Sequence, residues 1–159
     1  RLQHRRGIRG AESVYQSAIE MRIAMKIGSM SPSQLQELAW TIATCPFREL
    51  RTEHLALAEE SARRAFEAVP ENPKHPRALA LVLASNNPQA AINILQTPEQ
   101  RDGEYSAAEL FVRAIANYRL GQRDEANNLF RSGEALLERT PGVYEFDVLW
   151  ELAQTELAK

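Results

Sequence analysis

A ladder of alanines constrains the fold of this chain most. Ala58, Ala62 and Ala65 follow one another at spacings of four and three, and Pro70 stands five residues further on. Such spacings place side chains one above another on one side of an α-helix, and a proline marks where a helix stops. A small side chain at every turn lets the backbone of a second helix come close. The segment therefore predicts a helix packed closely against a partner helix.

Capping signals divide the rest of the chain into helices. Ser31 precedes Pro32 and is followed three residues later by Gln34, and Ser106 is followed three residues later by Glu109. Both patterns are typical of a helix start, where serine and Glu or Gln satisfy backbone N–H groups reciprocally. No segment alternates as a half-buried strand would. The predicted helices span residues 11–28, 32–45, 53–69, 75–85, 88–96, 106–120, 123–138 and 143–158.

We expect a single helical domain over residues 11–159, preceded by a poorly ordered basic arm. Residues 1–10 hold four of the 19 basic residues and none of the 21 acidic ones, so the remainder carries a net charge of −6. Because a nucleic-acid-binding surface needs a basic face, this balance argues against nucleic acid as a partner. The domain divides into a leading helix 11–28, hairpins at about 32–69, 75–96 and 106–138, and a closing helix 143–158.

The chain offers little chemistry. His4, His54 and His75 have no metal-ligand spacing among themselves or with Cys45, and neither a phosphate-binding loop nor a kinase signature occurs. We therefore expect no catalytic residue, metal or cofactor, and not an enzyme. A single cysteine fits a reducing compartment, and the longest apolar runs cannot span a bilayer, so we expect a cytoplasmic protein with no membrane partner. Since the first residue is Arg1 rather than Met, we expect a fragment of a larger protein.

The last hairpin carries a pattern of small and large residues. Ala114 precedes Gly121 at the turn, and Ala126, Phe130 and Gly133 follow on the second helix. Together with the alanine ladder, this pattern resembles the tetratricopeptide repeat (TPR) family. The resemblance implies an all-α, right-handed superhelix of antiparallel helical hairpins, with 143–158 as the helix that closes the array. It also implies a scaffold that binds a peptide or a helix of a partner protein.

Two narrower resemblances refine this expectation. Residues 38–46, which read Leu-Ala-Trp-Thr-Ile-Ala-Thr-Cys-Pro, look like a unit of planctomycete-type TPR proteins. Some of those are tails of serine/threonine protein kinases, so a regulatory or docking region of a signalling enzyme is the alternative function. Residues 15–22 resemble the second helix of a longer unit of the kinesin-light-chain kind.

The family resemblance also implies a binding groove, because the first helix of each hairpin lines the inner face of such arrays. The residues placed there are Trp40, Arg77, Leu81, Phe111, Ile115, Tyr118 and Arg119. Phe111, Ile115 and Tyr118 form one stripe at spacings of four and three, and the alternative is that this stripe belongs to the core. Guanidinium groups can clamp a carboxylate, so we expect the partner to be an extended or helical segment with an acidic group.

Both ends of the domain carry apolar stripes. The leading helix offers Tyr15, Ile19, Ile23 and Ile27 at spacings of four, which predicts self-association through that helix. In the closing helix, Leu149 and its apolar neighbours are expected to face the array, and Glu145 to face water.

Overall fold

The computed structural model of the chain describes residues 2–25, 27–95, 105–139 and 144–158, and all regular structure in these residues is helical. The predicted all-α class is thereby confirmed for the described part of the chain. A short 3-10 helix, Ile27–Ser29, follows the first α-helix. The α-helices are α1 (Leu2–Ala24), α2 (Pro32–Ala43), α3 (Arg48–Glu53), α4 (Leu55–Ala68), α5 (Lys74–Leu83), α6 (Pro88–Leu95), α7 (Ala107–Arg119), α8 (Arg123–Leu137) and α9 (Tyr144–Leu157).

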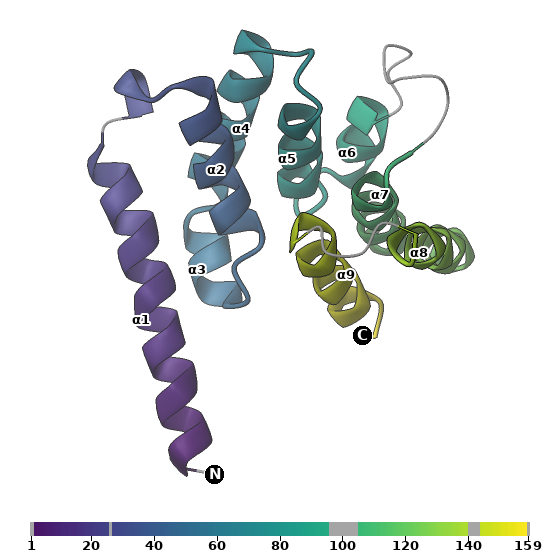
Figure 1. Cartoon of the computed structure of the whole chain (residues 1–159), viewed down its shortest axis with the longest axis horizontal. Helices are drawn as coiled ribbons and strands as arrows, with labels where there is room; N and C mark the ends of the chain where they lie inside the picture. Colours follow the sequence, from purple (N-terminus) through teal and green to yellow (C-terminus); the bar gives the residue numbers. More distant parts are fainter. Residues whose placement is uncertain (1, 26, 96–104, 140–143, 159) are drawn as a thin grey trace.

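Three pairs of helices stand next to one another in chain order (Figure 1). Helix α2 packs on α4, α5 on α6, and α7 on α8. The second helix of each of the first two pairs also contacts the first helix of the next pair, since α4 touches α5 and α6 touches α7. The three pairs therefore share one continuous row of contacts instead of forming separate units.

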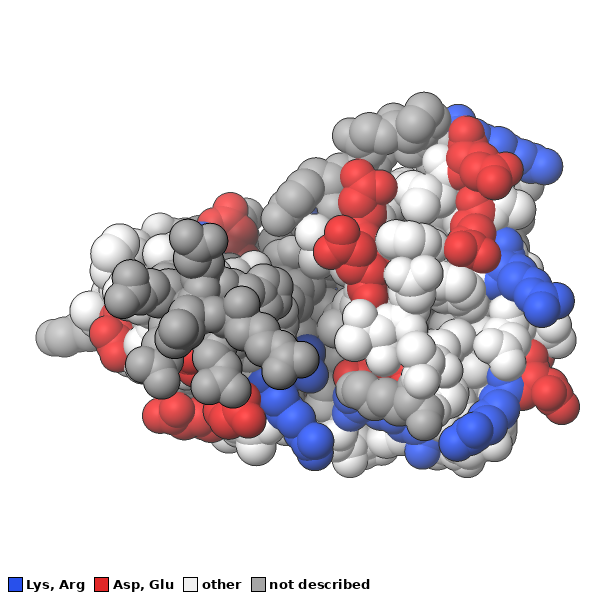
Figure 2. Space-filling model, turned by 90° about the horizontal axis from the view of Figure 1, so that it is seen from below, with Lys and Arg blue, Asp and Glu red and all other residues white. Residues whose placement is uncertain are grey.

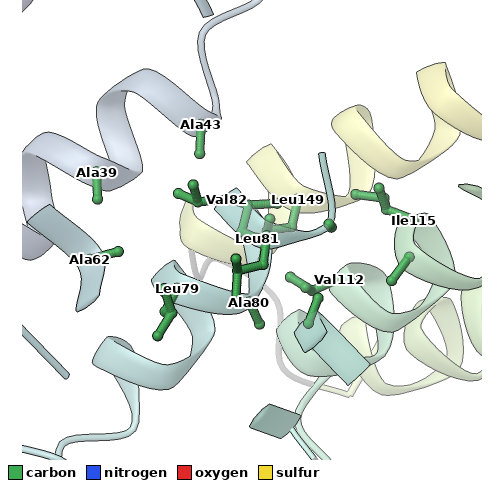
Figure 3. Packing of buried hydrophobic residues seen from close by; sticks show 14 of the residues in the cluster. Ala39, Ala43, Ala62, Leu79, Ala80, Leu81, Val82, Val112, Ile115 and Leu149 are labelled. Atoms are coloured by element: carbon green, nitrogen blue, oxygen red, sulfur yellow. The ribbon is translucent and has the colours of Figure 1, made fainter. Parts of the chain in front are cut away.

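The alanine ladder forms the contact between α2 and α4. Ala58, Ala62 and Ala65 have no exposed surface, and neither do Leu38 and Ile42 of α2. Because alanine projects only a methyl group, the two helices approach closely and the larger side chains of α2 fill the space between them. The contact continues into a core cluster that runs through α5 and α7 to α9 (Figure 3).

Local capping sets where the first helix of two pairs begins. At the start of α2 the backbone N–H of Ser31 donates to Gln34 Oε1 at 2.8 Å, and the N–H of Gln34 donates to Ser31 Oγ at 3.3 Å. Ser106 and Glu109 repeat this arrangement at the start of α7, with distances of 2.7 and 3.3 Å. Both predicted capping boxes are confirmed. Between α7 and α8, Gly121 adopts a φ of 80°, a left-handed conformation that side chains disfavour.

Two stretches differ from the sequence prediction. Residues 46–52, which lie between the predicted helices 32–45 and 53–69, contain most of α3 (Arg48–Glu53), and α4 begins at Leu55. Helix α1 starts at Leu2, so residues 2–10, which we expected to be a basic arm, belong to the first helix. The predicted polar loop 97–105 lies almost entirely outside the described residues.

Helix α1 leans on the body along only part of its length (Figure 1). Ile19 is fully buried, and the ring of Tyr15 lies edge-on to that of Phe47 with centroids 5.9 Å apart. On the neighbouring side, Val14 and Met21 are 68% and 69% exposed. The buried part of the predicted stripe thus faces the body, while a second apolar stripe faces outwards. None of the helices in the described ranges combines the length and the apolar character needed to cross a lipid bilayer.

Candidate functional site: the arginine face beneath α9

Helix α9 packs on α7 and, to a lesser extent, on α8 (Figure 1), and an ion pair joins it to α5. In Figure 3 its Leu149 lies with Leu81 and Val82 of α5 and with Ile115 of α7, all in one buried cluster. Leu81 and Ile115 are each 3% exposed. Both were expected to line an open groove. That expectation is wrong, because both are buried members of the core cluster, together with Leu149 of α9.

Phe111, the third apolar groove residue, also belongs to the core. It has no exposed surface, and its ring lies 5.6 Å from that of Phe130, centroid to centroid. A Cβ added to Gly133 would lie 2.6 Å from Cε1 of Phe111, closer than such atoms come in proteins. Gly133 therefore makes room for an aromatic ring of α7. Phe111 fixes the α7–α8 contact and does not reach a partner.

Two aromatic groove residues are only partly buried. Trp40 packs against the core cluster from α2. Tyr118, near the end of α7, has the guanidinium carbon of Arg123 5.3 Å from its ring centroid. Both side chains therefore keep some exposed surface, unlike Phe111 and Ile115.

The two arginines of the predicted groove do contact carboxylates, and both carboxylates belong to α9. Nη1 of Arg77 lies 3.3 Å from Oε1 of Glu145, and Nη2 of Arg119 lies 3.1 Å from Oε2 of Glu156. Backbone contacts orient both side chains: Nε of Arg77 donates to the Pro73 carbonyl and Nη1 of Arg119 to that of Ser85, each at 3.1 Å. Glu145 was expected to face water, and this ion pair corrects that expectation.

A third arginine was missed at the sequence level. Arg51 of α3 lies with Nη2 3.8 Å from Oε1 of Glu156, and its Nη1 donates to the carbonyl of Cys45 at 3.2 Å. Glu156 thus has one guanidinium on each carboxylate oxygen while its side chain is only 8% exposed. Arg51 was missed because it lies between the predicted helices 32–45 and 53–69, where we expected no helix.

We call this surface the arginine face, defined by Arg51, Arg77 and Arg119 around Leu81 and Ile115. The side of α9 turned towards it carries Glu145, Leu149, Ala153 and Glu156, at spacings of four, four and three. These spacings place the four side chains on one side of a helix, with carboxylates at both ends and apolar groups between them. The arginine face and this side of α9 are therefore complementary in charge and in polarity.

One further hydrogen bond holds α9 from outside the arginine face. Nε1 of Trp150 donates to Oε1 of Glu134 on α8 at 2.9 Å. The indole is partly buried against the core cluster. Helix α9 is consequently tied to α3, α5, α7 and α8.

Two titratable groups outside the arginine face have shifted pKa values. Burial raises the pKa of the Cys45 thiol, and a backbone hydrogen bond from Phe47 and the charge of Arg51 offset part of that rise. Because the thiolate is the nucleophilic form, a raised pKa makes this thiol less reactive. The hydrogen bond from Asn86 lowers the pKa of Glu59. Within residues 2–25, 27–95, 105–139 and 144–158, no group of three or more His, Cys, Asp or Glu side chains is arranged to hold a metal ion.

Surface charge is mixed on the face that Figure 2 shows. Acidic side chains form separate groups, and Lys and Arg lie between and beside them without forming one continuous field. A surface that tracks a phosphate backbone would be basic throughout. This view therefore gives no support to a nucleic-acid interface on that face.

Comparisons of the chain with protein-family models, with curated proteins and with solved structures gave no match. We therefore infer the function of the chain from the geometry of the arginine face.

Proposed function

We propose that this chain is a protein-interaction scaffold of the TPR-like kind, and that the arginine face is where it holds a segment of a partner protein. The observation that carries the proposal is the convergence of Arg51, Arg77 and Arg119, from three different helices, on the carboxylates of one helix. Arginine is enriched at protein interfaces and can recognise carboxylates through two-point contacts.

The shape of the array supports this proposal. The second helices α4, α6 and α8 pack on α2, α5 and α7. Two of the three arginines that pair with α9 come from first helices, α5 and α7, so first helices form part of the surface that α9 covers. In a stack of such pairs the exposed side of the first helices is a long surface that suits an elongated ligand. The ligand chemistry that this surface accepts is visible in α9: a helix with apolar residues between carboxylates.

A selection experiment tests the proposed function. A displayed library of 15-residue peptides is selected on the immobilised full chain, and fluorescence anisotropy measures the affinities of the selected peptides. We expect acidic amphipathic peptides, and we expect Arg119→Glu to weaken their binding by about tenfold, as loss of a close charge contact does. Arg131→Glu, an exposed change on α8, is the matched control and should have no effect. Because Arg119→Glu also weakens the hold on α9 through Glu156, the comparison is made in chains that both carry Glu156→Gln, and equal binding with and without Arg119→Glu there would refute the arginine face as the binding site.

A further inference from the structure

Helix α9 buries fewer side chains than α7, the helix on which it mainly packs. Helix α7 buries nine residues, eight of them apolar. Among the α9 side chains that the structure describes, only Leu149, Ala153 and Glu156 are buried, and one of these is a carboxylate. Phe146, Trp150 and Leu152 also pack against the core cluster but keep some exposed surface, and ion pairs lie near both ends of the helix. An apolar centre with a charged rim is typical of contacts between separate proteins.

Three ion pairs join α9 to the array. Glu145 pairs with Arg77 near the start of α9, and Glu156 pairs with Arg51 and Arg119 near its end. All three guanidiniums remain on the array when α9 leaves, and each keeps a backbone carbonyl as a hydrogen-bond acceptor, from Cys45, Pro73 and Ser85. The arginine face is therefore preorganised to accept another pair of carboxylates at the same spacing.

We infer that α9 is the resting occupant of the arginine face, and that a partner helix of the same chemistry displaces it. This inference rests on the proposed function and adds the partner class and its regulation. The partner is an amphipathic helix from another protein, with two acidic residues eleven positions apart and small or branched apolar residues between them. In the free protein α9 occupies the face, and partner binding is reduced by the small fraction of molecules in which α9 is detached.

The charge pattern selects this partner over other occupants. A basic helix would bring its cations against three guanidiniums, and a purely apolar helix would leave them without carboxylates. A second copy of the chain could also supply its α9, and the experiment below includes that outcome.

The test weakens α9 in the full chain and offers the face a free peptide. The variant carries Glu145→Gln with Glu156→Gln, and the matched control carries Asp147→Asn with Glu151→Gln, two exposed carboxylates of the same helix. The probe is a fluorescent synthetic peptide with the sequence of residues 144–158, and anisotropy measures its affinity. Hydrogen exchange of the α9 amides reports detachment independently of binding.

We expect the peptide to bind the Glu145→Gln/Glu156→Gln variant at least about tenfold more tightly than it binds the parent or the control. The substitutions raise the fraction of molecules in which α9 is detached, and the apparent affinity of the peptide rises with that fraction. The α9 amides of the variant should exchange faster, and those of α7 should not. A peptide with arginine at both glutamate positions should not bind. Trp150→Phe, which loosens α9 without touching the arginine face, should raise peptide affinity in the same direction.

Each contrary result has a distinct meaning. Faster exchange in α9 without peptide binding would overturn the arginine face as a binding site, and with it the proposed function. Equal peptide affinity for parent and variant, with exchange in α9 increased, would overturn displacement and leave the scaffold proposal standing. A dimer of the variant that excludes the peptide and is abolished by Arg119→Glu would identify a second copy as the occupant and overturn the assignment to a different protein.

Discussion

The first and last helices of the described chain meet the array in opposite ways. Helix α9 lies on the arginine face, with Leu149 and Ala153 fully buried and a carboxylate near each of its ends paired with arginine. Helix α1 is longer, but its one described ion pair with the body, between Arg22 and Glu37, spans 3.4 Å between side chains that are 34% and 61% exposed. It also leaves Val14 and Met21 largely exposed.

This contrast shows that length and apolar content do not decide how firmly a helix is held. What differs is whether the opposing surface carries matching groups at matching positions. The arginine face presents three guanidiniums to α9, whereas the surface beneath α1 covers Ile19 and leaves the next stripe of α1 uncovered. We therefore interpret the contact of α9 with the array as specific. We expect the outward stripe of α1, with Val14 and Met21, to take part in self-association.

The largest effect is expected at Glu156. Replacing it by alanine leaves Arg51 and Arg119 without their carboxylate, and breaking such a partly buried pair costs about 2–3 kcal/mol of stability of the α9 contact. Hydrogen exchange of the α9 amides measures this cost. The exposed Glu151→Ala change on the same helix is the control and should stay within about 0.5 kcal/mol of the parent. If both variants behave alike, α9 is held by its apolar side chains and the contrast with α1 loses its electrostatic basis.

The next largest effect is expected at the contact between α7 and α8, the two helices on which α9 packs. Gly133→Leu brings side-chain atoms into the space of the Phe111 ring, and overpacking of this kind destabilises by about 1–3 kcal/mol despite the better helix propensity of leucine. Chemical denaturation of the full chain measures it. Gly28→Leu serves as the comparison, because a Cβ there meets no atom within 4 Å. A variant at position 133 that is more stable than the parent would show that the α7–α8 contact can open to admit the side chain.

A smaller effect should appear in self-association through α1. Val14→Ser combined with Met21→Ser removes exposed apolar surface, and we expect the association constant to fall about tenfold, or about 1.4 kcal/mol. Sedimentation equilibrium over a range of concentrations gives this constant. Leu120→Ser, which removes a 37% exposed side chain at the end of α7, should leave association unchanged. A parent chain that stays monomeric at every concentration would contradict the role given to this stripe.

The smallest effect is expected for the exposed ion pair of α1. Glu37→Ala removes the partner of Arg22, and an exposed pair contributes only about 0.2–1 kcal/mol, decreasing with salt. Denaturation at low and high ionic strength measures the difference. A loss as large as that for Glu156→Ala would mean that α1 is anchored as firmly as α9, and the comparison would then fail.

Local features of the fold were predictable from the sequence because their signals are local. Ser31 with Gln34, and Ser106 with Glu109, form capping boxes as their spacing predicts. The alanine ladder predicted a close helix contact for the same reason, since one turn of helix places its methyl groups in a row. By contrast, nothing in residues 46–52 signalled that α3 would carry Arg51 to the arginine face.

The site could be predicted only in part. Arg77 and Arg119 were expected to bind an acidic group of a partner, whereas the carboxylates they meet in the structure belong to α9 of the same chain. The apolar stripe through Phe111 and Ile115 was assigned to an open groove, although its spacing is the same for a groove and for a core. Whether α9 covers that stripe depends on contacts between residues far apart in the chain, such as Arg51 and Glu156.

The two carboxylates of α9 are spaced so that each meets arginine at one end of the arginine face. Glu145 and Glu156 are eleven residues apart, which is close to three full turns, so both point the same way. One residue inserted between them would turn the second carboxylate by about 100° and carry it away from Arg51 and Arg119. A helix of suitable charge but unsuitable spacing would satisfy only one end of the face. If a partner helix binds the arginine face as proposed, we expect the spacing of its carboxylates to matter as much as its composition.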